Sequence, residues 1–413
     1  MNRRIVITGI GTVSALGVGL DALWRAALEG RTGISTIKRF DVSRYRSQLG
    51  AEFADFDPSD RVDRKFCKRA DRFAQFALYA TDIALEHAGL HIDEGNRAQV
   101  GVLIGSGIGG METWEQQFER LLKRGPERVS PFLVPMMIID MASGLVSMAT
   151  GAMGPNLATV TACASGSHAL AAAVDLIKLG RARAMIAGGA EAGITRSALG
   201  GFCSAGAVSV RNDDPEHACR PFDRDRDGFV MGEGATVMVI EDLQYAQERG
   251  APIIAELTGV GLSGDAHHIT EPDPEGLGAA LAMQAALDDA GLTAGELDYI
   301  NAHGPGTRAG DASEARSIVT VLGEHVSEVP VSSTKPIHGH MLGATGATEL
   351  ALCCMAMREG VIPHTVNCDH PDVDPRLDIV RGEPRQAPVR VAMCNSFGFG
   401  GHNVVLVVEQ FEE

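Results

Sequence analysis

The sequence predicts an α/β protein built from layers of helices packed on sheets. Short β-branched runs alternate with alanine-rich stretches along most of the chain. A chain of 413 residues with 45% hydrophobic content can bury a large core. A weak internal repeat further indicates that the layers are duplicated.

The β-branched runs predict strands, and the alanine-rich runs between them predict helices. The expected strands are 4–10, 100–105, 158–161, 184–187, 236–240 and 389–392, and the expected helices are 73–88, 167–179 and 277–290. The helix over 167–179 consists of very small residues, so we expect it to be packed on all sides.

The repeat consists of ITGIGTVSALG at 7–17 and LTGVGLSGDA at 257–266, each a strand that runs into a glycine turn. It predicts two similar halves, 1–250 and 251–413. The run Arg-Gly-Ala-Pro at 249–252 follows a helical segment and is a reasonable boundary between them.

Charge and hydropathy exclude several classes of protein. The net charge of −17 argues against nucleic acid as a partner, because neutralising phosphates requires a basic surface. There is no run of about 18 apolar residues, so no membrane span is expected. The first 20 residues imitate a secretory signal, but glycine, serine and threonine interrupt the apolar part, which favours a strand and a turn. The eight cysteines lack paired spacings and indicate reduced thiols in a cytoplasmic protein.

One cysteine stands where a predicted strand gives way to a helix. In TVTACASGSHAL at 159–170, Cys163 is expected to meet free backbone amides and the positive end of the helix dipole. That placement favours the thiolate, which is the nucleophilic form. The alternative is a small buried thiol that fills space in the core.

Polar residues in three other segments give the cysteine a chemical context. YINAHGPGTRAGDASE at 299–314 carries His303, and CNSFGFGGHN at 394–403 ends in a tight turn with free amides. The segment SSTKPIHGHMLGATGATE at 332–349 carries Lys335, His338, His340 and Glu349. A nucleophile, two imidazoles and amides that can face an oxyanion together indicate acyl transfer.

These motifs resemble those of β-ketoacyl-[acyl carrier protein] synthases of the elongating type, nearest to synthase II. The matching pieces are VITGIGTVSALG, GSGIGG, TACASGSHA, RPFDRDRDGFVMGEGA, NAHGPGT, STKPIHGHMLGATGA and NSFGFGGHN. The resemblance implies the thiolase fold, in which two homologous halves form a five-layered αβαβα sandwich. It also implies a homodimer, with a heterodimer with a chain-length-factor-like subunit as the alternative.

The resemblance implies a role for each residue of the reacting centre. Cys163 would accept the acyl group, while His303 and His340 would assist decarboxylation of malonyl-carrier protein and stabilise the enolate. Lys335 and Glu349 would be charges behind the reacting groups that orient this set.

The resemblance also implies how the acyl chain is held. The amides of Cys163 and Phe399 would form the oxyanion hole, and the Phe399 ring would gate the acyl pocket. Ile108 would limit or admit longer chains. Met136 and Met137 lie in a segment expected to reach the pocket of the partner subunit.

The sequence departs from the family at two positions. Pro305 stands where the family usually has threonine, which leaves Thr307, together with Thr270, to bind the pantetheine arm. His338 replaces a small or hydroxyl residue and is either structural or an accessory polar group.

Docking of an acyl carrier protein, which is acidic, requires a local basic patch. The positions that correspond to carrier-docking residues of the family are Lys65, Lys68, Arg69, Arg128 and Arg211. The alternative for each is ordinary solvated charge.

Two motifs could indicate metals. His338, His340 and His303 could in principle supply three zinc ligands, but the resemblance already explains the motif that holds the pair. The run 223–228 begins like a calcium loop, but position 12 is Gly234 instead of glutamate. We therefore expect no metal, and no cofactor beyond the phosphopantetheine of the carrier.

The function implied is decarboxylative Claisen condensation, which lengthens an acyl chain on the way to a fatty acid or polyketide by two carbons. The active ketosynthase subunit of a type II polyketide or polyene synthase heterodimer stays open, and Pro305 and His338 favour it mildly. A non-catalytic partner subunit would lack Cys163. A degradative thiolase, with Cys394 as a second cysteine, is disfavoured by the two histidine motifs.

Overall fold

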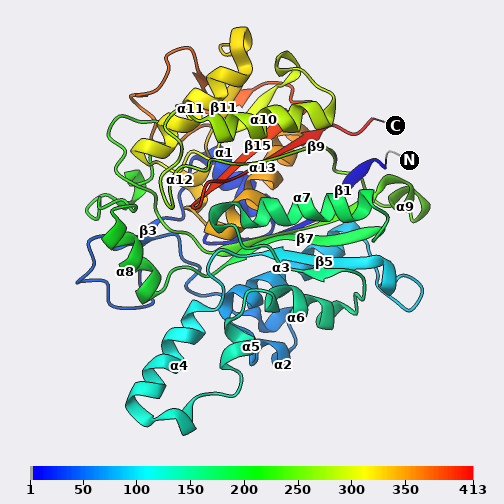
Figure 1. The fold of residues 1–413 in the computed structure, drawn as a ribbon, viewed down its shortest axis with the longest axis vertical. Helices are drawn as coiled ribbons and strands as arrows, with labels where there is room; N and C mark the ends of the chain where they lie inside the picture. The colour runs from blue at the N-terminus through cyan, green and yellow to red at the C-terminus, as the bar shows by residue number, and fades with distance from the viewer. Residues whose placement is uncertain (1–2, 413) are drawn as a thin grey trace.

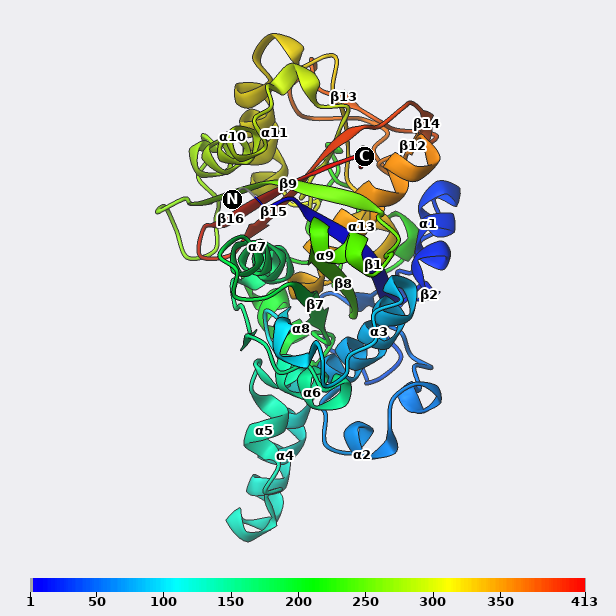
Figure 2. The same cartoon turned by 90° about the vertical axis from the view of Figure 1, so that its right-hand side faces the viewer.

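The computed structural model describes residues 3–412 and has five layers (Figure 1, Figure 2). Helices α7 (Ser165–Lys178) and α13 (Thr345–Glu359) lie at the centre, between two sheets. Helix α3 (Arg72–Ala88) covers the outer face of one sheet, and α10 (Leu277–Ala290) covers the outer face of the other. This order of layers confirms the αβαβα sandwich that the resemblance implies.

The strands of the N-terminal sheet are β1 (Ile5–Ser14), β5 (Val100–Gly105), β6 (Asn156–Leu157), β7 (Ala184–Glu191) and β8 (Gly234–Asp242). Those of the C-terminal sheet are β9 (Ala255–Gly264), β10 (Tyr299–Asn301), β11 (Pro330–Ser332), β13 (Asp378–Ile379), β15 (Val391–Gly398) and β16 (His402–Glu409). The short strands β2 (Gly17–Val18), β3 (Ser35–Thr36), β4 (Leu49–Gly50), β12 (Val361–Ile362) and β14 (Arg385–Gln386) form small pairings beside them.

The remaining helices surround this stack. They are α1 (Leu20–Glu29), α2 (Arg64–Cys67), α4 (Met111–Arg124), α5 (Leu133–Met137), α6 (Met141–Thr150), α8 (Arg196–Ala205), α9 (Leu243–Glu248), α11 (Arg308–Leu322) and α12 (Lys335–His338). Helix α4 projects from the body of the molecule, and α5 runs back beside it (Figure 1).

The two sheets share one topology. Their strand orders are β6-β5-β7-β8-β1 and β11-β10-β15-β16-β9, and β13 extends the second. In each sheet the first two pairings are parallel and the last two are antiparallel. The strands β1 and β9 occupy matching positions and also pair with each other, which joins the sheets.

Both faces of the central strands are buried, which explains their continuous apolar sequences. In β8, Val237 and Val239 pack in the core beneath α3, whereas Met238 and Ile240 pack against the central helices. The predicted helix over 167–179 lies in this central layer as α7, and most of its side chains are buried. Asp175 and Leu179 are exposed, however, and His168, Ala172 and Leu176 on the same face are only half-buried. The prediction of packing on all sides is therefore wrong for this face of the helix.

The sequence repeat marks equivalent close contacts between a strand and a helix. A Cβ atom on Gly11 of β1 would lie 2.0 Å from the carbonyl oxygen of Ala80 in α3. A Cβ atom on Gly261 of β9 would lie 1.9 Å from the carbonyl oxygen of Ala282 in α10. Each half therefore requires glycine at the same place, because the helix backbone approaches the strand directly.

The predicted strand over 158–161 is wrong. Strand β6 ends at Leu157, and the residues after it bond to the start of α7 instead. Thr159 Oγ1 donates to the carbonyl of Ser165 at 2.8 Å, and the Thr161 amide donates to Ser165 Oγ at 2.9 Å. Hydroxyl groups offer the backbone local partners that compete with a sheet ladder.

The segment around residue 250 connects α9 to β9. The boundary between halves at 250 and 251 stays a prediction. Within residues 3–412, none of the helices combines the length and apolar character needed to cross a membrane.

We predict that Gly11→Ala and Gly261→Ala each lower the free energy of unfolding by about 3 kcal/mol, because overpacking forces backbone shifts. Urea denaturation followed by circular dichroism would measure the loss. Gly144→Ala is the control, since a Cβ there meets only the Met141 side chain, at 3.7 Å, in the interior of α6. An effect of Gly11→Ala no larger than that of the control would contradict the close-contact explanation.

Candidate active site

The nucleophile candidate lies on a strained turn at the start of a central helix. Residues Ala162–Ala164 form one 3₁₀ turn that leads into α7. Ala162 has a φ of 52°, a left-handed conformation that costs energy for a residue other than glycine. The hydroxyl of Ser165 donates to the Ala162 carbonyl at 2.7 Å and holds the turn. Cys163 is thereby fixed with 8% of its surface exposed.

The surroundings of Cys163 disfavour the thiolate in the free protein. Burial raises the pKa of the Cys163 thiol to about 12, whereas the Lys335 ammonium and the backbone amides of Phe399 and Cys163 lower it. The amides therefore act in the predicted direction, but desolvation outweighs them. Burial, which the position at a helix start does not reveal, therefore keeps the thiol protonated in the free protein.

The two histidines come from neighbouring turns of the C-terminal half. His303 follows β10, and His340 follows α12. Their ring centroids are 5.3 Å apart and the rings are nearly perpendicular. Burial and the nearby Lys335 ammonium hold the pKa of both imidazoles well below the usual value, so both rings are neutral near pH 7. Nδ1 of His340 lies 3.0 Å from Thr345 Oγ1, which fixes the orientation of that ring.

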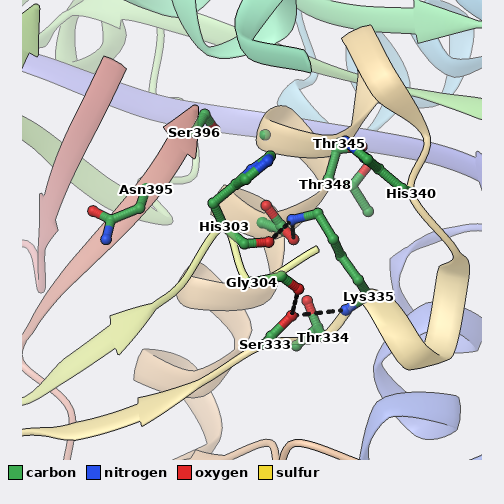
Figure 3. Close-up of polar contacts among 12 residues, drawn as sticks. His303, Gly304, Ser333, Thr334, Lys335, His340, Thr345, Thr348, Asn395 and Ser396 are labelled. Atoms are coloured by element: carbon green, nitrogen blue, oxygen red, sulfur yellow. Dashed lines mark hydrogen bonds and ion pairs between the residues drawn. The ribbon is translucent and has the colours of Figure 1, made fainter. Parts of the chain in front are cut away.

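Lys335 and Glu349 form a fully buried ion pair, and the Lys335 side chain reaches the backbone of His303 (Figure 3). Lys335 Nζ donates to Glu349 Oε1 at 2.6 Å and also to the backbone carbonyl of His303. Burial raises the pKa of the Glu349 carboxyl, and the Lys335 ammonium opposes that rise. The pair connects the backbone of the His303 turn to α13, so both residues lie where the resemblance expects orienting charges.

A second buried carboxylate, Glu314, also holds the His303 turn. Its oxygens accept from the amides of His303 at 2.8 Å and Gly304 at 2.7 Å, and from Asn395 Nδ2 at 3.1 Å. Glu314 is not predicted by the sequence, because a carboxylate that binds backbone amides leaves no motif of its own.

One cavity of about 650 Å³ brings most of the predicted site together. Of the predicted residues, Cys163, His303, His340, Phe399, Ile108, Thr270 and Thr307 line it. The ring of Phe399 lies 6.3 Å from that of Phe202, and Phe202 packs against Phe229. Aromatic side chains thus line the cavity beside the polar groups.

The structure does not bring Met136 and Met137 into this cavity. Their backbone packs behind it, where the Gly110 amide donates to the Met137 carbonyl at 3.0 Å. Both residues are half-buried in α5. A contact with the pocket of a partner subunit stays a prediction.

The candidate pantetheine residues lie at the rim of the cavity. Thr307 begins α11 and accepts from the Gly310 amide at 3.2 Å. Thr270 is exposed on the loop after β9. Pro305 lines the cavity between the His303 turn and Thr307.

The predicted docking residues fall into two groups. Lys65, Lys68 and Arg69 are exposed in and after α2, and the Arg69 guanidinium lies 5.1 Å from the ring centroid of Phe132. Arg128 is exposed on the turn that precedes Phe132. Arg211 is half-buried on a different loop, beside the Asp225 carbonyl.

His338 is buried, and both of its ring nitrogens contact groups of its own turn. Nε2 contacts Thr334 Oγ1 at 3.2 Å, and Nδ1 contacts the Gly339 carbonyl at 2.7 Å. Burial lowers the pKa of His338 to about 3. These contacts favour the structural role.

No group of three or more His, Cys, Asp or Glu side chains within residues 3–412 is arranged to hold a metal ion. In the calcium-like run, Asp223 is fully buried and pairs with Arg220 at 3.2 Å. That segment is a turn rich in charge pairs.

A duplicated sandwich whose halves contribute a cysteine and two histidines to one cavity defines an acyltransferase of the thiolase fold. Residues 2–246 match the family model of the beta-ketoacyl synthase N-terminal domain, and residues 254–369 match that of the C-terminal domain. The chain is 49% identical over 410 residues to 3-oxoacyl-[acyl-carrier-protein] synthase 2 of Synechocystis sp., with 99% of each chain covered. The chain belongs to the beta-ketoacyl synthase family.

Solved ketosynthases share the whole architecture. A structure described as the ishigamide ketosynthase/chain length factor has a TM-score of 0.91 and 34% identity, with 100% of each chain covered. A type II PKS acyl-carrier protein in complex with its ketosynthase, bound to the hexaketide, gives a TM-score of 0.91 and 30% identity, again with 100% of each chain covered.

We predict that alkylation of Cys163 by iodoacetamide accelerates about 100-fold between pH 7 and pH 9, because the thiolate fraction grows tenfold per pH unit below the pKa. Mass spectrometry of the peptide that contains Cys163 would follow the rate, and Cys163→Ser provides the control. A rate that levels off below pH 8 would show that the thiol ionises much more readily than its burial predicts.

Proposed function

We propose that the protein is a β-ketoacyl-[acyl carrier protein] synthase that catalyses decarboxylative Claisen condensation. The observation that carries the proposal is that Cys163 and two neutral imidazoles, His303 and His340, line one cavity. The Synechocystis relative, named 3-oxoacyl-[acyl-carrier-protein] synthase 2, supports the same reaction.

The first step transfers an acyl group to the protein. The sulfur of Cys163 attacks the thioester carbonyl, and the bond to the carrier's sulfur breaks. The thiol of Cys163 gives up its proton, and the carrier leaves as a free thiol. Because the thiol of Cys163 is protonated at rest, a neutral imidazole in the cavity is suited to accept and return that proton.

The second step forms the carbon–carbon bond. Malonyl-carrier protein loses its carboxylate as CO₂, and the electrons of the broken bond form an enolate. The enolate carbon attacks the acyl group on Cys163, the carbon–sulfur bond breaks, and the sulfur leaves as a thiolate. The product is a β-ketoacyl thioester on the carrier, two carbons longer than the starting chain.

The site is suited to stabilise negative charge on oxygen in both steps. The amides of Cys163 and Phe399 lower the pKa of the Cys163 thiol, so they lie close to the sulfur. They are therefore near the place where the oxygen of a thioester bound to Cys163 would develop charge. Neutral imidazoles can each donate one N–H to the enolate oxygen. A single donor of this kind is typically worth about 3 kcal/mol of barrier. Lys335 and Glu349 would act by holding the histidine turn in place.

The remaining assignments extend the same proposal. Ile108 and Phe399 would shape the acyl pocket, Thr270 and Thr307 would contact pantetheine, and no cofactor beyond that arm is required. We place the halves at 1–250 and 251–413, and the protein in the cytoplasm as a homodimer. The ketosynthase/chain length factor relative keeps a heterodimer of a polyketide pathway as the second candidate.

We predict that Cys163→Ala abolishes elongation but retains malonyl decarboxylation, because only the acyl acceptor is lost. Mass spectrometry of carrier-bound products and CO₂ release would separate the two reactions. The matched control is His340→Ala, which should impair decarboxylation by about two to three orders of magnitude through loss of a donor. Unchanged elongation by Cys163→Ala would overturn the assignment.

We also predict that Lys65→Glu combined with Arg69→Glu raises the KM for acyl carrier protein on the order of tenfold, with little change in kcat. The effect should shrink with added salt, because exposed charge pairs are screened. Arg97→Glu with Arg181→Glu makes the same change of charge at other exposed positions and should leave KM unchanged. Equal effects of the two pairs would argue against a docking site at α2.

A further inference from the structure

Glu191, the last residue of β7, is a fully buried carboxylate whose role the proposed reaction does not explain. It accepts from four donors. Oε1 accepts from Ser106 Oγ at 2.9 Å and the Ile108 amide at 3.2 Å. Oε2 accepts from the amides of Gly107 at 2.7 Å and Gly343 at 3.0 Å. Four donors are what a buried carboxylate needs in place of water.

These donors belong to both halves of the molecule. Ser106, Gly107 and Ile108 form the turn after β5, and Ile108 lines the cavity. Gly343 lies three residues after His340, in the turn that begins α13. One carboxylate therefore fixes the wall of the acyl cavity against the segment that carries a histidine of the site.

The duplicated fold shows which position Glu191 occupies. Cys163 and Gly343 are each the middle residue of a 3₁₀ turn that leads into a central helix. Each follows a residue with positive φ, 52° at Ala162 and 44° at Leu342. Gly343 is thus the counterpart of the nucleophile, and its amide is the counterpart of the Cys163 amide.

The strand ends match in the same way. Strands β7 and β15 hold equivalent places in their sheets, and they end at Glu191 and Gly398. The end of β15 lies against the Cys163 turn, where a Cβ on Gly398 would be 3.2 Å from the Cys163 amide nitrogen. The end of β7 supplies Glu191 to the Gly343 amide. The carboxylate thus occupies the second copy of the anion-binding position.

We propose that Glu191 is a positioning residue that fills this second anion site and thereby sets the Ile108 wall of the acyl cavity against the His340 turn. The proposal rests on the proposed function, because it assigns acyl-chain selection to the geometry of that same cavity. Displacement of such walls by about 1 Å is enough to change rates on the order of 100-fold.

Two substitutions separate the contacts of Glu191. In Glu191→Gln the amide nitrogen can donate to Ser106 Oγ but cannot accept from the Ile108 amide, so the Ile108 wall loses its anchor. The remaining oxygen still accepts from Gly107 and Gly343. Glu191→Ala removes all four acceptor contacts and leaves space for a small carboxylate.

The experiment compares kcat/KM for acyl groups of graded length in wild type, Glu191→Gln, Glu191→Ala and the control Glu241→Gln. Glu241 is also buried on the N-terminal sheet, but it pairs with Arg249 at the opposite end of β8. Thermal unfolding of each variant reports the loss of stability separately from the change of specificity.

We expect Glu191→Gln to alter the ratio of kcat/KM between long and short acyl groups by about tenfold or more, while Glu241→Gln keeps the wild-type ratio. We expect Glu191→Ala to lose about 100-fold in condensation. Formate at high concentration should restore at least tenfold of that loss, whereas chloride at the same ionic strength should not.

Three results would overturn the inference: a wild-type chain profile in Glu191→Gln, a loss in folded Glu191→Ala that formate does not relieve, or an equal shift in Glu241→Gln. If Glu191→Ala fails to fold, the profile of Glu191→Gln decides alone. Failure of the wild-type protein to condense any acyl group would instead refute the proposed function, so the two failures are distinguishable.

Discussion

The meeting of two turns at the centre of the molecule is the constraint on which the rest of the structure depends. The turns at Ala162–Ala164 and Leu342–Ala344 pack against each other where the central helices begin. A Cβ on Gly166 would lie 2.6 Å from the Gly343 carbonyl oxygen, and one on Gly343 would lie 2.5 Å from the Gly107 amide nitrogen. Only small residues fit there. This explains the small-residue sequences around both turns and places the cysteine beside the histidine half.

One buried cation then sets the electrostatics of the centre. Beside the larger effect of burial, the Lys335 ammonium further lowers the pKa of His303 and His340 and limits the rise in the pKa of the Cys163 thiol, and Glu349 pairs with this ammonium. Burial keeps the histidines neutral, and the same ammonium adds to that effect. A neutral imidazole is a hydrogen-bond donor that can also accept a proton, whereas an imidazolium can only donate. The ion pair would therefore support both proposed roles of the imidazoles, hydrogen-bond donation and proton acceptance, without contacting the substrate.

The sequence predicts the layers well and the fine contacts poorly. Strands buried on both faces leave a strong sequence pattern, as β8 shows. The motifs also locate Cys163 and the histidines. The net pKa shift of the Cys163 thiol cannot be predicted from its place at a helix start, because desolvation depends on everything packed around the sulfur. Glu191 and Glu314 were missed because their partners are backbone amides, which every sequence contains.

The two halves of the fold have equivalent turns at the start of their central helices, but only one of these turns carries a cysteine. Both halves present an amide at the base of a central helix, after a residue of positive φ. At the Cys163 amide the facing strand ends in Gly398, so the amide stays available to a ligand in the cavity. At the Gly343 amide the facing strand ends in Glu191, and its carboxylate takes the place that a ligand would hold. The difference between the halves therefore depends on Gly398 and Glu191, which end two equivalent strands, as much as on the cysteine.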